Sequence, residues 1–284
     1  MKMIKQFLKA VCYVALYFIM QYVMVFAASF AYSIFLGVKL GFSGADMQSL
    51  DSNQLNLQIA ESVMSATSYL IILAGIISIL ILVVWFRVRG KRLCAEACLG
   101  SFDKRFLLAV FVGSIGLCLM INFGMELLPI SEEALSEYSQ ATELLMQSPF
   151  WVLFLCNVIM APLVEEILFR GLALSRLREA FPDGVALLIS SAIFGLAHGQ
   201  IIWICYTFVV GLILGYVMLK TGSGRACILM HACFNLFGTV VGSIAIPISF
   251  GVCVALAVCG VLLIALSAIL MAKVSKQILP ADNL

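Results

Sequence analysis

The sequence predicts an all-α fold, a polytopic transmembrane bundle of about eight helices, from its composition, its apolar runs and its charge pattern. Of the 284 residues, 63% are hydrophobic and only 11% are charged, whereas about a quarter of the residues of a soluble domain are charged. The mean hydropathy is +1.13. One soluble core cannot cover so much apolar surface, so the sequence excludes a soluble domain and indicates an integral membrane protein.

Eight apolar runs account for the predicted helices. A membrane-spanning helix needs about 20 residues, and only the fifth run is short. The first run is too long for a cleavable signal peptide and lacks a clear small-residue cleavage site, so we expect it to remain as a span. No internal repeat divides the chain, and residues 1–284 are expected to form one membrane domain. The runs cover residues 7–36, 62–86, 106–128, 150–173, 185–199, 201–220, 226–245 and 249–272.

The basic residues predict the orientation of these spans. Among the seventeen Lys and Arg residues, only Lys39 falls on the side opposite the others in an eight-span arrangement. The positive-inside rule therefore predicts that both termini lie in the cytoplasm. A seven-span arrangement would scatter the basic residues over both sides. The opposite side carries the acidic residues Asp46, Asp51, Glu132, Glu133, Glu137 and Glu143.

The loop between the third and fourth spans has a pattern of its own. Residues 130–147, ISEEALSEYSQATELLMQ, place Leu135, Tyr138 and Leu145 at roughly helical spacing. This spacing is typical of an amphipathic helix lying on the membrane surface. A solvated loop is the alternative.

The stretch APLVEEILFR (161–170) places three charges inside the fourth apolar run. Each charge at the bilayer centre costs roughly 2.5–3.5 kcal/mol on insertion scales, so partners are expected. Glu166 and Arg170 are four residues apart and are predicted to pair on one helix face. Glu165 points about 100° away from Glu166 and has no partner in its own helix. Pro162 removes a backbone hydrogen bond and is predicted to kink the span, which frees a carbonyl and opens room beside Glu165.

The alternative is that these charges only mark the cytoplasmic end of the span. The residues that follow Arg170 are again mostly apolar. If Arg176 and Arg178 mark the interface, Glu165 lies roughly 16–20 Å deep at 1.5 Å per residue. An ionisable side chain at that depth is a candidate functional residue.

The chain has two histidines, and both lie in apolar runs, His198 in the fifth and His231 in the seventh. Asn235 follows His231 by four residues, so the two side chains project from one helix face about 6 Å apart along the axis. A lone buried histidine is more often a satisfied core residue, and that alternative stays open. Two intramembrane imidazoles, an amide at this spacing and an unpartnered carboxylate on another helix favour a site.

These side chains are sufficient for hydrolysis. Glu165 would act as the general base that takes a proton from water, because desolvation raises the pKa of a carboxyl toward neutrality. His198 would hold the same water. His231 and Asn235 would donate hydrogen bonds to the developing oxyanion, where such donors are worth several kcal/mol in a low-dielectric site.

The same atoms allow a second chemistry, since Glu165, His198 and His231 form a ligand set that zinc accepts. The HExxH motif is absent, and no second carboxylate is obviously placed as a separate base. The ten cysteines lie mostly in apolar runs without a CxxC pair, which favours small apolar filler over disulfides or metal ligands. The cofactor prediction is therefore open between none and one divalent metal such as zinc.

Three motifs carry a resemblance to a known family. They read EEILFR (165–170), FGLAH (194–198) and HACFN (231–235), on separate predicted membrane helices. In this order they resemble the EExxxR, FxxxH and HxxxN motifs of the CAAX protease and bacteriocin-processing family, also called the Abi or type II CAAX prenyl endopeptidase family of intramembrane proteases. The resemblance covers about residues 150–245, the expected catalytic core.

The resemblance implies roles for individual residues. It implies that Glu165 and His198 activate water and that His231 and Asn235 stabilise the oxyanion. It gives Glu166 and Arg170 a structural or substrate-orienting role. Members are often labelled metalloproteases, yet the eukaryotic enzymes are argued to be metal-independent glutamate-type proteases. A metal, if bound, would take Glu165, His198 and His231.

The function favoured by these residues is an intramembrane endopeptidase that cleaves a membrane-associated peptide or protein. A proton-coupled transporter would use the same carboxylates and histidines as a relay, although recognisable inverted repeats and paired broken helices are absent. A non-catalytic regulatory or immunity scaffold of the same family is the third reading.

The expected partners are membrane lipid and a peptide or protein substrate, and no nucleic acid. Gly211 and Gly215, in the stretch GLILG, offer a face for close helix packing. That face would serve packing within one chain or, alternatively, a homodimer. The expected location is a bacterial cell membrane.

Overall fold

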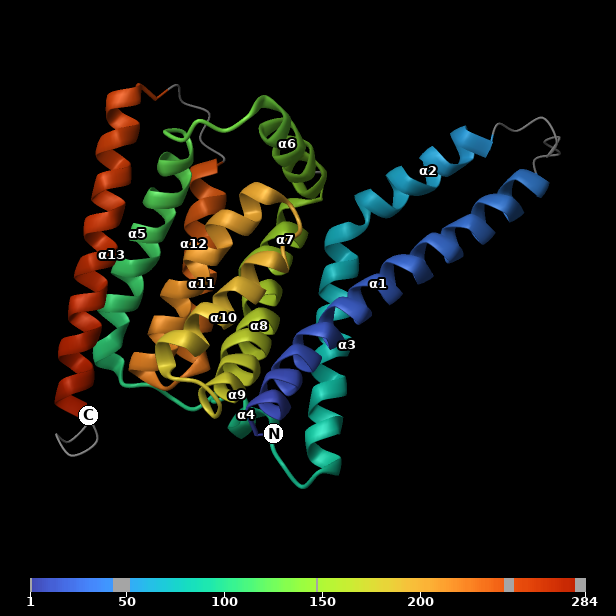
Figure 1. Cartoon of the computed structure of the whole chain (residues 1–284). Coiled ribbons are helices and arrows are strands. Elements are labelled where there is room, and N and C mark those ends of the chain that lie inside the picture. The colour runs from blue at the N-terminus through green and yellow to red at the C-terminus, as the bar shows by residue number, and fades with distance from the viewer. Residues whose placement is uncertain (1, 43–51, 147, 243–247, 279–284) are drawn as a thin grey trace.

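The computed structural model describes residues 2–42, 52–146, 148–242 and 248–278, and these residues contain helices and no strands (Figure 1). The all-α prediction is therefore confirmed for the described part of the chain. The continuous helices are α1 (Lys2–Phe42), α2 (Ser52–Ser65), α3 (Thr67–Val88), α4 (Leu93–Glu96), the 3-10 helix η1 (Lys104–Phe106), α5 (Leu107–Met125), α6 (Glu132–Met146), α10 (Asp183–Leu196), α11 (Ile201–Thr221), α12 (Gly224–Gly242) and α13 (Phe250–Ile278).

The fourth predicted span is one long helix with an irregular backbone. Two π-helical segments alternate with short α-helical ones along it. A π-helical segment contains one extra residue per turn and is frequent at functional sites. The segments are α7 (Phe150–Leu153), η2 (π, Phe154–Met160), α8 (Ala161–Glu165), η3 (π, Glu166–Leu174) and α9 (Ser175–Arg178).

The number of spans differs from the prediction. Within the described residues, seven helices are long and apolar enough to cross a membrane, where we predict eight. The difference lies in the predicted helix 185–199, because α10 has only 14 residues and at 1.5 Å per residue is shorter than a hydrocarbon core of about 30 Å. It ends before Gly199, whose φ of +73° is the left-handed conformation that commonly ends a helix.

Although α10 is short, the chain still runs along it from one end of the bundle toward the other, so the direction of the chain alternates between the helix before α10, α10 itself and α11 (Figure 1). The start of α1 and the end of α13 lie at the same end of the molecule (Figure 1). This arrangement agrees with two termini on one side of a membrane, and the side itself stays a prediction. Asp46, Asp51 and the end of the predicted helix 226–245 fall outside the described residues.

The N-terminal region contains a helix that the sequence does not predict. α2 is a 14-residue polar helix, and it precedes the predicted span 62–86, which begins at Thr67 as α3. The far parts of α1 and α2 extend together away from the bundle (Figure 1). Many apolar side chains on α1 are exposed there, for example Phe26 at 74%.

Within the segment 130–147, residues Glu132–Met146 form the predicted helix as α6, and the solvated-loop alternative is wrong. The position of this helix on the membrane surface stays a prediction. In α6, the ring of Tyr138 packs edge-on against Trp203 of α11, with ring centroids 6.3 Å apart. Gln200 Nε2 donates to the backbone oxygen of Ala134 at 3.3 Å. α6 therefore covers the end of the bundle where α11 begins. The side chain of Leu145 lies outside the described part.

Small residues allow several helices to touch backbone to backbone. A Cβ on Gly260 of α13 would lie 2.5 Å from the backbone nitrogen of Met120 in α5. A Cβ on Gly211 of α11 would lie 3.1 Å from Ser191 Cβ of α10, and one on Gly215 would lie 2.2 Å from Leu187 Cδ1. Gly211 and Gly215 thus pack within the chain. All ten cysteines are free thiols, as predicted.

Candidate active site

The irregular backbone of the fourth span lies on both sides of Pro162, where the sequence predicts a disturbance. In η2 the N–H of Ala161 donates to Cys156, five residues earlier. By the same pattern the carbonyl of Asn157 would accept from residue 162, which is a proline without an N–H. Asn235 Nδ2 donates to that carbonyl instead, at 2.7 Å. The freed carbonyl thereby ties the fourth span to α12 and uses one amide hydrogen of Asn235.

The second carboxylate of the pair lies in the core. Arg170 Nη1 donates to Glu166 Oε1 at 2.9 Å, and the two side chains are 1% and 0% exposed. The guanidinium also donates to the Gly211 carbonyl at 3.3 Å and stacks 4.1 Å from the ring centre of Phe194. The predicted Glu166–Arg170 pair is confirmed. A buried ion pair is costly to break, because removal of one partner leaves an uncompensated charge.

Glu166 has a further partner that the sequence does not reveal. His231 Nδ1 lies 2.8 Å from Glu166 Oε1, on a helix 65 residues further along the chain. A carboxylate only accepts hydrogen bonds, so Nδ1 is the protonated nitrogen. Nε2 is then directed away from Glu166, and it lies 4.0 Å from Glu165 Oε2.

Glu165 lies at the wall of a cavity, with its side chain 15% exposed. No described residue donates a hydrogen bond to its carboxylate. The 4.0 Å between Glu165 Oε2 and His231 Nε2 exceeds a hydrogen bond. One oxygen atom that makes hydrogen bonds of about 2.8 Å to both groups fits this separation. Such an oxygen would lie beside the line that joins the two atoms, because two bonds of about 2.8 Å that span 4.0 Å meet at about 90°. One water molecule can therefore contact both groups.

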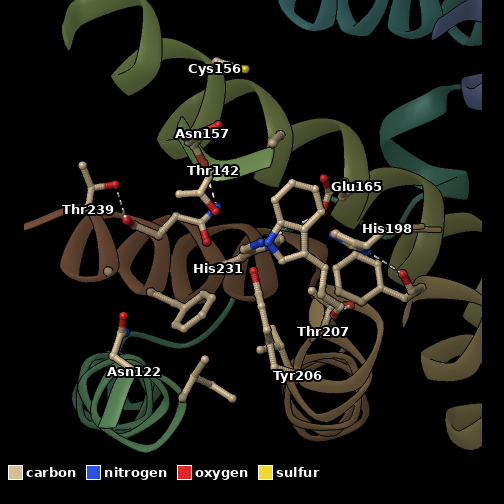
Figure 2. A pocket seen from close by; sticks show the side chains of 18 of the residues that line it. Asn122, Thr142, Cys156, Asn157, Glu165, His198, Tyr206, Thr207, His231 and Thr239 are labelled. Atoms are coloured by element: carbon tan, nitrogen blue, oxygen red, sulfur yellow. Dashed lines mark hydrogen bonds and ion pairs between the residues drawn. The ribbon is translucent and has the colours of Figure 1, made fainter. Parts of the chain in front are cut away.

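His198 lies in the turn that follows α10, not within the helix as predicted. Its Nδ1 is 2.8 Å from the backbone oxygen of Phe194, drawn as a dashed line in Figure 2. A carbonyl only accepts, so Nδ1 carries the proton and Nε2 is an acceptor in the neutral ring. The ring also packs edge-on against Phe194, with centroids 4.9 Å apart.

Glu165, His198, His231 and Asn235 all line one cavity of about 360 Å³ (Figure 2). Its wall also contains side chains that we did not predict. Tyrosines and small polar residues in apolar runs give no motif, so the sequence alone does not distinguish them from core residues. They include Tyr17 of α1, Asn122 of α5, Tyr138 and Thr142 of α6, and Tyr206 and Thr207 of α11.

A second cavity of about 450 Å³ adjoins the first. The two share Ile121, Met125 and Tyr206 as a common wall. The rest of the second cavity is lined almost entirely by apolar side chains from α5, α6, α11 and the segment before α6. Tyr138 of α6 lines the first cavity. Burial raises the pKa of its phenol, which therefore stays neutral.

The three candidate metal ligands, Glu165, His198 and His231, line the same cavity. The described part of the chain holds no group of three or more His, Cys, Asp and Glu side chains close enough to share an ion. His231 directs Nδ1 to Glu166 and keeps Nε2 4.0 Å from Glu165. A hydrogen bond from Nδ1 to a carboxylate is also common in zinc-binding histidines, and the steps below use the side chains of this chain alone.

The fold and the cavity together define the class of the protein. It is a helical multi-pass membrane protein in which one carboxylate, two imidazoles and one amide line a single cavity. Residues 147–237 match the family model of the type II CAAX prenyl endopeptidases, Rce1-like. This match confirms the predicted resemblance over the region that holds all three motifs, and at the level of the family it supports a CAAX-type intramembrane protease. No curated protein and no solved structure matches the chain.

Proposed function

We propose that the protein is an intramembrane endopeptidase that hydrolyses a peptide bond of a membrane-associated protein or peptide through an activated water molecule. The observation that carries the proposal is the 4.0 Å distance between Glu165 Oε2 and His231 Nε2 at the cavity wall. The family match supports it independently. We take residues 150–245 as the catalytic core.

The first step is proton removal from water. Glu165 is the general base, because its carboxylate faces the cavity and no described residue donates to it. The Nε2 of His198, an acceptor in the neutral ring, holds the second hydrogen of the water. As Glu165 takes one proton, the water oxygen forms a bond to the carbonyl carbon of the substrate, and the carbonyl oxygen becomes an oxyanion.

The second step is collapse of the tetrahedral intermediate. Asn235 keeps one amide hydrogen for the oxyanion after it donates to Asn157. A His231 ring with a proton on each nitrogen donates from Nε2 to the oxyanion while Nδ1 donates to Glu166. The C–N bond then breaks, and the proton on Glu165 passes to the leaving nitrogen. The products are a new carboxyl end and a new amino end.

Glu166 and Arg170 fix the position of the His231 side chain. Arg170 neutralises the buried Glu166 carboxylate, and Glu166 orients the ring of His231. These contacts agree with the structural role that the resemblance implies for Glu166 and Arg170.

The experiment is cleavage of a peptide library by purified protein in nanodiscs, with products identified by mass spectrometry. The library contains unmodified and prenylated peptides. Wild type is compared with Glu165→Gln and His198→Ala, and with Glu137→Gln as a control on the exposed face of α6. Cleavage by wild type and the control, but not by the two site variants, is expected. Equal cleavage by all four proteins would rule the proposal out.

A further inference from the structure

Most hydrogen-bond donors at the wall of the 360 Å³ cavity are already used. One amide hydrogen of Asn235 is committed to the Asn157 carbonyl, and the proton on neutral His231 is committed to Glu166. Three further side chains at the wall donate to carbonyls of their own helices. These are Asn122 to Cys118, Thr142 to Tyr138 and Thr207 to Trp203.

Tyr206 is an exception. It lies on α11, and its hydroxyl points into the cavity toward His231 (Figure 2). No described residue forms a hydrogen bond with this hydroxyl. Tyr206 is partly buried, and its hydroxyl is not one of the fully buried polar atoms that lack a partner. The hydroxyl is therefore open to the cavity and available to a bound group.

The position of Tyr206 fits a role at the reacting atoms. Glu165 and Tyr206 line the same cavity, so both side chains border the space that a substrate would occupy. The start of α11 is fixed, because the side chain of Gln200 accepts from the N–H of Trp203 at 3.0 Å. Tyr17 is another phenol of the cavity, and its hydroxyl oxygen accepts from Gln21 of the same helix at 2.7 Å.

We propose that Tyr206 is a further catalytic residue, whose phenolic O–H donates a hydrogen bond to the substrate oxygen as it becomes the oxyanion. The inference rests on the proposed function. The phenol keeps its proton throughout, and no bond to Tyr206 forms or breaks. Unlike His231, it is a donor without first being protonated. Such a donor stabilises the transition state more than the bound substrate, because the charge on the oxygen develops only there.

The test compares Tyr206→Phe with wild type on the peptide that the library assay selects. Tyr216→Phe is the matched control, since Tyr216 lies on the same helix and its hydroxyl binds the Ala268 carbonyl at 3.3 Å, outside the cavity. Loss of one oxyanion donor is expected to lower kcat about 100-fold, with KM within about twofold of wild type because ground-state binding is unchanged. The control is expected to keep both constants.

A second readout uses the phosphonamidate analogue of the same peptide, which mimics the tetrahedral intermediate. Tyr206→Phe should weaken its binding by the same factor as kcat, since the analogue reports transition-state contacts. Binding of the uncleaved peptide, measured in the Glu165→Gln background, should not change. Unchanged kcat, or a rise in KM alone, would overturn the inference and leave Tyr206 as a wall residue.

Two results separate this inference from the proposed function. If Glu165→Gln cleaves like wild type, the proposed function fails. If Glu165→Gln is inactive and Tyr206→Phe keeps full kcat, only the role of Tyr206 fails. If Tyr206→Phe does not fold, Tyr206→Gln, which retains a donor, is compared with Tyr206→Leu, which has none, and equal kcat for these two variants would overturn the inference.

Discussion

The Nδ1 nitrogen of His231 lies 2.8 Å from Oε1 of Glu166. This contact gives the two adjacent carboxylates different tasks. Successive residues of a helix point about 100° apart, so Glu166 points into the core toward Arg170 and His231, while Glu165 points into the cavity. The buried carboxylate of Glu166 orients the imidazole of His231. The carboxylate of Glu165 accepts no hydrogen bond from a described residue and can therefore accept a proton.

Glu166→Gln is expected to lower kcat by about 100-fold or more with a small change in KM. The amide that replaces the carboxylate cannot stabilise a protonated His231, and removal of the carboxylate behind a catalytic histidine is known to be severe. The assay is steady-state cleavage of the selected peptide, with Glu137→Gln as control. Retention of wild-type kcat would contradict the orienting role. A rise in KM alone would also contradict it.

Asn235→Ala should destabilise the protein by about 1 kcal/mol, because it removes the donor of the partly buried Asn157 carbonyl. Pro162→Ala restores an N–H that this carbonyl can accept. In the Pro162→Ala background the cost of Asn235→Ala should therefore shrink to well below 1 kcal/mol. The measurement is a double-mutant cycle from unfolding in detergent. Additive effects would show that Pro162 and Asn235 do not share the carbonyl.

Gly260→Ala and Gly124→Ala should change stability in opposite directions. A methyl group on Gly260 would lie 2.5 Å from the Met120 backbone nitrogen, whereas nothing lies within 4 Å of one on Gly124. Overpacking should cost about 1–3 kcal/mol at Gly260. Alanine at Gly124 of α5 should gain roughly 0.5–1 kcal/mol from lower chain entropy. Thermal unfolding measures both, and equal destabilisation by the two variants would show that the contact between α5 and α13 is not this close.

Removal of divalent metals should leave peptide cleavage unchanged. The described residues form no group of three metal-binding side chains, and the proposed steps use the side chains of this chain alone. Purified protein is dialysed against a chelator, its metal content is measured, and cleavage is assayed with and without added zinc. Activity lost with the metal and restored by zinc would refute the metal-independent mechanism.

Short-range relations could be predicted from the sequence. The Glu166–Arg170 pair follows from i, i+4 spacing, and the irregular backbone beside Glu165 follows from Pro162. The convergence of Glu165, His198, His231 and Asn235 follows from the cost of polar groups in apolar helices, since each needs a polar neighbour. The amphipathic spacing in residues 130–147 likewise predicts α6.

Long-range relations could not be predicted in this way. The Glu166–His231 contact joins residues 65 positions apart, and its choice of Glu166 over Glu165 depends on how the fourth span and α12 are rotated. Tyr206 is one tyrosine in an apolar run, and only the packing of α11 turns it toward the cavity. The span count was overestimated because the fifth predicted helix, α10, has 14 residues and is too short to cross the hydrocarbon core. Its end at Leu196 places His198 in the turn that follows.

The most direct test of the central claim is single-turnover cleavage of the selected peptide in ¹⁸O-labelled water by wild type and by Glu165→Gln. We predict one ¹⁸O atom in the new carboxyl end of the wild-type product. We also predict a rate for Glu165→Gln at least about 10³-fold lower at unchanged peptide affinity, within the range for loss of a general base. Equal single-turnover rates for the two proteins would contradict the account.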